Sequence, residues 1–405
     1  MMESGGRRLT VEDALALVLA DPPAPRSVEV GLLDALGRVL AEDVVADISM
    51  PPFDKSAMDG YAVRSEETAA APAELAVVDD IPAGKFPTRK IGRGEAARIM
   101  TGAPVPPGAD AVVMVEQTEA KGRDRVVVRN GVKPGENICA LGEDLREGSV
   151  ALRRGKIVRP PEVAILASCG QSRVRVVKAP TVTLMSTGDE LVEIDRKPEK
   201  GQIRNSNTWS LAAQVRAMGL PCAILGVARD TKEAIRAMAR EGLDRGDVLI
   251  VSGGVSVGEY DFVADALQAE GVQCLMHKVM IKPGRPFYFG RKGDQRVFAL
   301  PGNPVSTYVI FDVFVKPFLN LARGMEGGDV RRMRALVTSP LDRRSDRLQY
   351  IPGLCDLRGG RPTVAPVPWH GSADIAALTR ADCFIVLPPN APPLKEGDGV
   401  DIQLL

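Results

Sequence analysis

Over residues 181–326, short apolar runs alternate with segments whose apolar positions have helical spacing. "TVTLMS" at 181–186 is followed by a helical pattern at 207–219, and "DVLIVSGG" at 247–254 is followed by another at 261–270. This alternation is typical of parallel strands with helices on both faces of a sheet. We therefore predict that 181–326 forms a doubly wound, mostly parallel sheet domain.

The flanking segments have a different pattern. Residues 48–145 are rich in proline and glycine and contain short β-type runs, which predicts an inserted β-rich domain. Residues 1–47 and 146–180 contain helical patterns on either side of it, so we expect them to form one N-terminal domain around the insertion. Residues 327–405 show short apolar runs with turn signals, which predicts a small C-terminal β barrel. The predicted fold class is multidomain α/β.

Composition and charge narrow the class of protein. The chain has 405 residues with a formal net charge of zero, which argues against broad nucleic-acid or anionic-membrane binding. The six cysteines are scattered without a C-x-x-C pair, as expected for reduced thiols in the cytoplasm. Only His277 and His370 are present, so a Ser-His-Asp triad is not expected. No apolar run approaches the roughly 20 residues of a membrane span, so no membrane partner is expected.

Polar or glycine- and proline-rich motifs follow five predicted elements of the doubly wound domain. These motifs are "STGDEL", Asp230, "SGGVSVGEYDF", "KPGRP" and "PGNPVST". Any one alone is more often a simple turn. In an open doubly wound sheet, however, ligands bind outside the carboxyl ends of the strands. Five such motifs at one edge therefore predict a ligand site there.

The residue types at this edge favour a phosphate-bearing ligand held with a divalent cation. Glycines let the backbone approach a ligand, hydroxyls add hydrogen bonds, and several cations in one loop suit phosphate. Carboxylates beside such cations suit Mg²⁺, although Asp230 fits a helix N-cap equally well. The residues concerned are Asp189, Glu190, Asp230, Ser252, Gly253, Gly254, Ser256, Asp261, Lys278, Lys282 and Arg285.

Two common phosphate-binding signatures are missing. No G-x-x-x-x-G-K-[ST] motif occurs, which counts against a P-loop NTPase. Residues 253–258 read G-G-V-S-V-G and not G-x-G-x-x-G, which counts against a nicotinamide dehydrogenase.

A second group of polar residues lies in the predicted β-rich domain. "PPFDKSAMDGYAV" at 51–63 places Ser56 and Asp59 among prolines, and "TGAPVPPGADAVV" and "PGENICALGEDL" lie in the same domain. Small residues and carboxylates on stiff loops suit a polar ligand pocket. The alternative is a structural turn at Asp59 and Gly60.

Taken together, these motifs resemble the molybdopterin molybdenumtransferase family, which includes bacterial enzymes of molybdenum cofactor synthesis and the C-terminal domain of gephyrin. The resemblance rests on "FDKSAMDGYAV", "TGAPVPPGADAVV", "GENI" with "GEDL", "STGDEL", "GQIRNSN", "SGGVSVGEYDF", "KPGRP" and "LPGNPVS". These motifs occur in order between about residues 9 and 322, and the resemblance is weaker beyond.

The resemblance implies an activity and an assembly. Such enzymes insert molybdenum from molybdate into adenylylated molybdopterin and release AMP, with Mg²⁺ or a similar cation. They form elongated homodimers of four-domain chains, with each active site shared between the doubly wound domain of one subunit and the inserted domain of the other. The partners implied are molybdopterin adenylyltransferase and proteins of molybdoenzyme maturation. Neither nucleic acid nor membrane is implied.

The resemblance also implies roles for individual residues. The N–H groups near Asn303 and Val305 would face the phosphate side of the pterin. Catalytic roles fall to Asp59, Glu190, Asp261, Lys278 and Lys282, and metal binding to Asp189, Glu190, Asp230 and Asp261. Substrate binding falls to Ser56, Thr101, Asp144, Thr187, Gly188, Asp230, Ser252, Gly253, Gly254, Ser256, Arg285, Pro301, Asn303, Pro304 and Ser306.

Two other functions and one residue assignment stay open. An adenylyltransferase acting on molybdopterin shares the doubly wound fold but lacks the "SAMDGYA" insertion, and a gephyrin-like scaffold would not need the polar residues. After "DRRSD" the family has an aromatic residue, an apolar residue and an arginine, whereas this chain has Arg347, Leu348 and Gln349. Either Arg347 or Gln349 would then replace the family's arginine. The sequence does not distinguish molybdate from tungstate.

Overall fold

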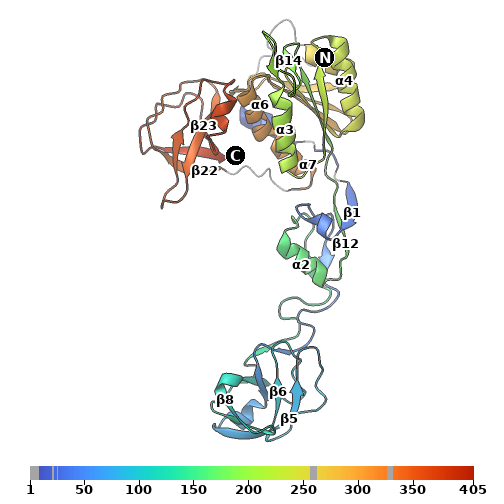
Figure 1. The fold of residues 1–405 in the computed structure, drawn as a ribbon, viewed down its shortest axis with the longest axis vertical. Coiled ribbons are helices and arrows are strands. Elements are labelled where there is room, and N and C mark those ends of the chain that lie inside the picture. Colours follow the sequence, from blue (N-terminus) through green and yellow to red (C-terminus); the bar gives the residue numbers. More distant parts are fainter. Residues whose placement is uncertain (1–8, 21, 25, 256–261, 326–331) are drawn as a thin grey trace.

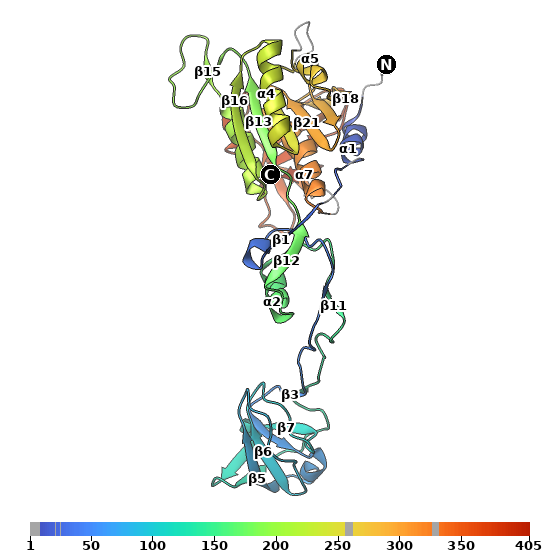
Figure 2. The same ribbon diagram turned by 90° about the vertical axis from the view of Figure 1, so that its right-hand side faces the viewer.

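The computed structural model describes residues 9–20, 22–24, 26–255, 262–325 and 332–405. The predicted site residues Ser256 and Asp261 lie outside the described residues. The molecule is elongated, with the doubly wound domain and the C-terminal barrel at one end and the β-rich domain at the other (Figure 1). A small domain lies between them, and the second view shows the same separation (Figure 2).

The doubly wound domain is built on a six-stranded sheet. Its strand order is β16-β13-β17-β21-β20-β18. The first four strands are parallel, whereas β20 is antiparallel to both β21 and β18. The predicted mostly parallel sheet is thus confirmed. The strands are β13 Val182–Thr187, β16 Cys222–Ala228, β17 Val248–Ser252, β18 Gln273–His277, β20 Tyr288–Lys292 and β21 Gln295–Leu300.

Helices cover both faces of this sheet. One face packs against α3, α6, α7 and the N-terminal helix α1, and the other packs against α4 and α5. Helix α1 lies in the segment 1–47, which was predicted to belong to the N-terminal domain, but its buried Val11, Ala14 and Val18 belong to the core of the doubly wound domain. The helices are α1 Val11–Leu19, α3 Ser206–Ala217, α4 Lys232–Arg245, α5 Phe262–Ala269, α6 Pro304–Ile310, the π-helical η4 Phe311–Val315 and α7 Lys316–Ala322.

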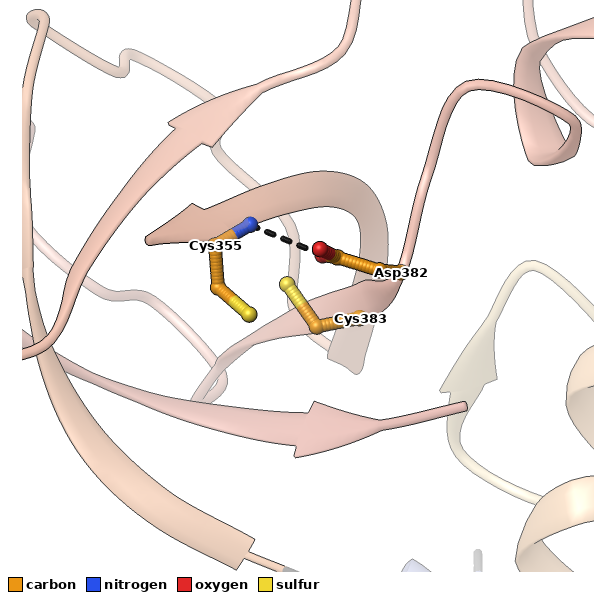
Figure 3. Close-up of side chains that lie close together, drawn as sticks. All are labelled: Cys355, Asp382 and Cys383. Atoms are coloured by element: carbon orange, nitrogen blue, oxygen red, sulfur yellow. Dashed lines mark hydrogen bonds between the residues drawn. The ribbon is translucent and has the colours of Figure 1, made fainter. Parts of the chain in front are cut away.

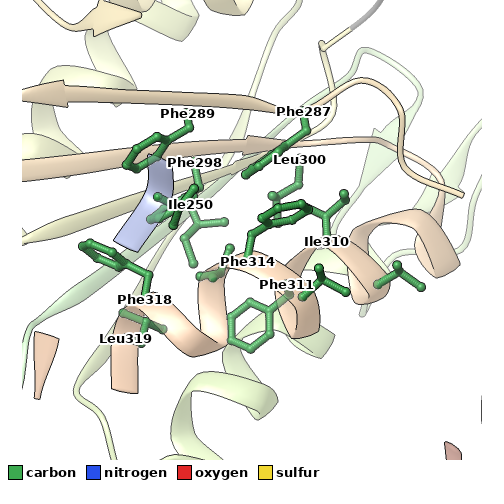
Figure 4. Close-up of a cluster of buried hydrophobic side chains, with 14 of the residues drawn as sticks. Ile250, Phe287, Phe289, Phe298, Leu300, Ile310, Phe311, Phe314, Phe318 and Leu319 are labelled. Carbon is green, nitrogen blue, oxygen red and sulfur yellow. The ribbon is translucent and has the colours of Figure 1, made fainter. Parts of the chain in front are cut away.

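The segment Pro304–Ala322 is one continuous helix that crosses the core (Figure 4). Among the described residues it is the one helix long and apolar enough to cross a membrane, and most of it is buried inside the protein. Phe311, Phe314 and Phe318 all come from this helix, and Phe314 stacks on Phe287 at 4.8 Å between ring centroids. Its apolar character is therefore explained by packing in the protein core.

The β-rich domain is a sheet of order β7-β4-β6-β5-β9-β8 that is antiparallel apart from the β5–β6 pair. The chain enters and leaves it side by side, since Met50 bridges Leu145 and β2 pairs with β11. This is the predicted insertion. The strands are β3 Lys55–Ser56, β4 Gly60–Val63, β5 Ala73–Ile81, β6 Glu95–Ile99, β7 Ala111–Met114, β8 Thr118–Lys121, β9 Arg125–Val128 and β10 Ile138–Cys139, with η2 Ser65–Thr68 and η3 Val115–Gln117.

The small middle domain is made from both segments that flank the insertion. Strand β1 pairs with β12 in an antiparallel ladder, and Leu40, Val158 and Leu166 form part of its core. Its elements are β1 Ser27–Gly31, η1 Leu33–Ala35, β2 Val44–Val45, β11 Val150–Leu152, α2 Pro160–Ser168 and β12 Arg173–Val177.

The C-terminal domain is the predicted small barrel. Its strand order is β19-β23-β24-β22-β26-β25, and the additional pairing of β23 with β25 closes it. Strand β19 comes from the doubly wound domain, so one sheet joins the two domains. The elements are β19 Ile281–Lys282, β22 Arg332–Val337, β23 Leu348–Asp356, β24 Thr363–Pro366, α8 Ile375–Leu378, β25 Cys383–Leu387 and β26 Gly399–Leu404.

Candidate functional site

A cavity of about 510 Å³ opens at the carboxyl ends of β13, β17 and β21. This is the edge at which the sequence predicts a ligand site. Eleven of the predicted residues line the cavity: Thr187, Gly188, Glu190, Asp230, Ser252, Gly253, Gly254, Pro301, Asn303, Pro304 and Ser306.

Two adjacent glycines shape the floor of the cavity. Gly253 has a φ of +93°, and a Cβ there would lie 2.5 Å from the carbonyl oxygen of Thr187. Gly254 has a φ of +67°, and its Cβ would lie 2.5 Å from Cγ2 of Val263. A side chain is therefore excluded at both positions by backbone strain and by contact. The loop after β17 consequently lies against the end of β13 with its backbone facing the cavity.

Asn207, in the first turn of α3, links the end of β17 to the turn and helix that follow β21. Its side-chain amide donates to Oγ of Ser252 at 3.0 Å, to the carbonyl oxygen of Gly302 at 2.7 Å and to Oγ1 of Thr307 at 3.3 Å. The sequence analysis did not name Asn207 as a site residue, although it lies in the "GQIRNSN" motif at the start of α3. A polar residue in the first turn of that helix, two residues after the N-cap Asn205, was the signal available. Ten further residues that line the cavity were not predicted as site residues: Ser186, Leu191, Ile203, Arg204, Asn205, Ser206, Val255, Pro286, Gly302 and Ala373.

An acidic corner lies at the ends of β13 and β16. The Thr187 hydroxyl donates to Oδ1 of Asp230, and the Asp230 backbone N–H donates to Oδ1 of Asp189 at 3.3 Å. Asp230 is not the cap of α4, because Thr231 accepts the hydrogen bond from Ala234 N–H. Glu190 is exposed and lines the cavity beside them. The carboxylate of Asp230 is thus oriented at this corner by a hydroxyl.

These carboxylates do not form a preassembled metal cluster. Among the described residues, Asp189, Glu190 and Asp230 do not bring their carboxylate oxygens within 4.8 Å of one another as a group. Asp189 and Glu190 are both exposed. A cation at this corner would therefore have to gather at least some of them on binding.

The turn "PGNP" at 301–304 is held by hydrogen bonds to the C-terminal domain. Strand β21 ends at Leu300 and α6 begins at Pro304, with the Thr307 hydroxyl donating to the carbonyl oxygen of Pro301 at 2.5 Å. The expectation that the Val305 N–H faces a ligand is wrong, because it donates to the carbonyl oxygen of Ser372 at 2.9 Å. The Asn303 amide donates to Oγ of the same serine at 2.9 Å. Ser372, next to the cavity residue Ala373, holds the start of α6 in place.

The predicted cations do not line the cavity. Lys278, Lys282 and Arg285 are exposed, although Pro286 of the same loop does line it. The backbone of this loop is fixed at both ends, since Lys278 N–H donates to Phe287 and Lys282 pairs with Gln349 in the barrel sheet.

The second predicted group stays in the β-rich domain. Oδ1 of Asp59 accepts the backbone N–H of Thr101 at 2.7 Å and its hydroxyl at 2.8 Å. These hydrogen bonds, the backbone one first, hold the pKa of Asp59 below its usual range. Ser56 is buried and its hydroxyl donates to the carbonyl oxygen of Met58 at 2.5 Å, so it fixes the turn. Asp144 is exposed and its N–H donates to Met50, where the chain leaves the domain.

The structure therefore separates the predicted residues into two groups. Asp59 and Thr101 lie in the domain at one end of the molecule, and the cavity lies in the domain at the other end (Figure 1). Within one chain these groups do not form a common pocket.

Three family models match almost the whole chain. Residues 9–170 match the MoeA N-terminal region (domain I and II), 183–321 a probable molybdopterin binding domain, and 334–405 the MoeA C-terminal region (domain IV). The chain is 32% identical over 400 residues to the molybdopterin molybdenumtransferase of Staphylococcus aureus strain Mu50, covering 98% of this chain and 95% of that protein. This chain belongs to the molybdopterin molybdenumtransferase family.

Solved structures agree with this membership. The molybdopterin biosynthesis MoeA protein of Pyrococcus horikoshii OT3 is 31% identical, with a TM-score of 0.86 over 98% of this chain and 100% of that one. A molybdenum cofactor biosynthesis protein of Pyrococcus furiosus has the same fold at 21% identity and a TM-score of 0.61. All residues that line the cavity, except Ala373, lie within the segment that matches the probable molybdopterin binding domain.

Proposed function

We propose that this protein inserts molybdenum from molybdate into adenylylated molybdopterin and releases AMP. The observation that carries the proposal is the cavity at the carboxyl edge of the sheet, built by the segment that matches a molybdopterin-binding family model. The full-length match to molybdopterin molybdenumtransferases supports this reaction over adenylyl transfer, because it includes the inserted domain and the barrel.

The polar backbone of the cavity floor suits the phosphate groups of the substrate. The Gly253–Gly254 loop has no side chains in the way, and Ser252 and Ser306 add hydroxyls. Lys278, Lys282 and Arg285 add positive charge in the neighbouring loop, which would attract an anionic ligand.

Mg²⁺ is proposed at the acidic corner, with Asp189, Glu190 and Asp230 as candidate ligands. Carboxylate oxygens are the ligands that Mg²⁺ prefers, so the donor set fits. The cation would neutralise phosphate charge when bound. Asp230 is already oriented by Thr187, and Oδ1 of Asp189 accepts the Asp230 N–H, while the exposed Glu190 lies beside them and can turn toward a cation. Asp261 is a further proposed ligand outside the described residues.

A homodimer with a shared active site is proposed from the distance between the two groups of residues. Within one chain, Asp59 and Thr101 lie far from the cavity. In a symmetric dimer, the β-rich domain of each chain can reach the cavity of the other chain and bring Asp59 and Thr101 to it. A cytoplasmic location and a supply of substrate from a molybdopterin adenylyltransferase are proposed with it.

The reaction can be tested with the purified full-length protein. We would incubate it with adenylylated molybdopterin and Mg²⁺ and quantify AMP by chromatography with and without molybdate. AMP release that depends on molybdate supports metal insertion. AMP release without molybdate, or none with it, would contradict the proposal, and the latter is the outcome expected of a scaffold.

A further inference from the structure

The C-terminal barrel contains two thiols and a carboxylate that face one another away from the cavity (Figure 3). Strand β23 changes partner at Gly353, which is opposite Cys383 of β25 and also opposite Pro366 of β24. Cys355 follows two residues later on β23, and Asp382 directly precedes β25. This pairing places Cys355 close to Asp382 and Cys383.

The spacing of these side chains is that of a group of metal ligands. The two Sγ atoms and a carboxylate oxygen of Asp382 all lie within 4.8 Å of one another. Among the described residues, no other three His, Cys, Asp or Glu side chains gather so closely. Gly353 keeps the space beside them open, since a Cβ there would lie 3.1 Å from Sγ of Cys383.

We propose that Cys355, Asp382 and Cys383 bind a thiophilic divalent cation of the zinc class. At a zinc–sulfur distance of about 2.3 Å, the ligand atoms of a tetrahedron lie roughly 3.8 Å apart, so these groups need to approach by no more than about 1 Å. Thiolate ligands select zinc over magnesium. The site is therefore chemically distinct from the acidic corner of the cavity.

Burial defines how the cation would be held. Cys383 is fully buried, Cys355 is half-buried and Asp382 is exposed. A cation can therefore enter from the Asp382 side, where a water molecule completes four ligands. Oδ1 of Asp382 accepts the Cys355 N–H at 2.8 Å, and the carboxylate has further lone pairs for a metal.

The same environment argues against a reactive thiol. Burial raises the pKa of Cys383 and of Cys355, so both stay protonated in the absence of a metal and are poor nucleophiles. A disulfide between them would require a two-electron oxidant. A cation instead displaces the two thiol protons and gains two thiolate ligands.

The test uses Cd²⁺, whose bonds to thiolate give an ultraviolet charge-transfer band. The reduced, chelator-treated full-length protein is titrated with Cd²⁺, and Zn²⁺ is then added to displace it. We expect a band that saturates at one equivalent and disappears with Zn²⁺ but not with excess Mg²⁺. Cys355→Ser should lose the band, whereas the control Cys274→Ser, an exposed cysteine elsewhere, should keep it.

A second variant separates coordination from folding. Loss of an outer-shell partner already weakens metal sites by about 10–100-fold, so Asp382→Asn should weaken Cd²⁺ binding at least tenfold while leaving its circular dichroism unchanged. Unaltered Cd²⁺ affinity in both Cys355→Ser and Asp382→Asn would overturn the proposal. So would the absence of the band in the native chain, or a Cys355–Cys383 disulfide found by mass spectrometry in freshly purified protein.

Discussion

Asp59 combines an ionised carboxylate with a fixed position. Its Oδ1 accepts two hydrogen bonds from Thr101, which lower its pKa and keep it charged. Asp59→Asn retains an oxygen for the Thr101 N–H but loses the charge. We expect the fold to be nearly unchanged. The rate of molybdenum insertion should fall at least ~100-fold, as is typical when a group that stabilises the transition state electrostatically is removed.

The control for this prediction is Asp80→Asn, an exposed carboxylate of the same domain. Rates of AMP release and thermal unfolding of both variants give the comparison. An Asp59→Asn variant with the activity of the control would show that Asp59 is only a turn residue.

Lys282 is expected to contribute charge at the cavity without being part of its wall. Because it is exposed, Lys282→Ala should leave folding unchanged and should weaken binding of the adenylylated substrate. Rising salt should narrow the difference from the native protein, since exposed charges are screened. Lys395→Ala, an exposed lysine of the barrel, is the matched control. Equal affinity of Lys282→Ala and control at low salt contradicts the role.

Single residues at the cavity were predictable to different degrees. Gly253 and Gly254 were predictable, because a pair of glycines after a strand indicates that the backbone closely approaches a ligand. The structure shows that a Cβ at either position would collide with neighbouring atoms. The role of Asn207 in linking α3 to the end of β17 and to the turn after β21 was not predictable, because its partners Ser252 and Gly302 lie far away in sequence. The contact of Ser372 with Val305 was likewise beyond reach, since it depends on how two domains dock.

At the scale of elements, the pairing of strand β19 with the barrel fixes the loop that contains Lys278, Lys282 and Arg285 against the C-terminal domain. Nη1 of Arg347 donates to the carbonyl oxygen of Ile281 at 3.3 Å, whereas Gln349 is buried and donates to the carbonyl oxygen of Arg343. We expect Arg347→Ala to weaken substrate binding while preserving the unfolding temperature. Gln349→Ala should leave substrate affinity unchanged and lower the unfolding temperature, because it removes a buried side chain together with its hydrogen bond to the Arg343 carbonyl.

Substrate affinity and unfolding temperature of both variants decide this assignment. The opposite ranking would place the family's arginine function at position 349. Two variants with native affinity would show that the barrel makes no such contribution.

Helices α4 and α5 are joined by a buried carboxylate. Glu270 accepts hydrogen bonds from Arg240 and Arg236, which lower its pKa from 4.5 to about 2. A carboxylate with a lowered folded-state pKa stabilises fully above its unfolded pKa, and this stability is lost as the pH falls toward the folded value. Glu270→Gln should therefore cost about 2 kcal/mol near neutral pH, with the cost shrinking as the pH drops below about 4.5.

The measurement is the unfolding temperature of native protein and Glu270→Gln as a function of pH. Glu241→Gln is the control, since Glu241 pairs with Arg245 at the exposed surface and should change stability little. A difference between native protein and Glu270→Gln that is the same at pH 3 and pH 7 would contradict the ionic origin of the effect.

Elements as such were largely predictable. The parallel strands and their helices follow from the apolar periodicity, and the end of β21 at Leu300 follows from the proline after it. The docking of α1 on the doubly wound domain was not predictable, because the apolar face of a helix does not indicate which domain covers it. Its Val11 and Val18 pack on the doubly wound domain, across the sequence gap formed by the middle and β-rich domains.

At the scale of the whole molecule, the insertion determines how far the β-rich domain lies from the doubly wound domain. The chain runs out through the middle domain, forms the β-rich domain and returns beside itself, which places the β-rich domain at the opposite end of the molecule from the doubly wound domain (Figure 2). The sequence predicts the insertion but not its reach, because extended linkers have no periodic signal. We therefore propose that a second chain completes an active site that uses both groups of residues.

The most direct test of the proposed shared active site is complementation between two inactive variants. Asp59→Asn removes the β-rich group and Glu190→Gln alters the cavity wall, and equal amounts are mixed under conditions that exchange subunits. If each site is shared, half of the dimers are mixed and each has one intact site, so AMP release should return to about a quarter of the native rate. Confirmed exchange with no recovery of AMP release would contradict the shared site.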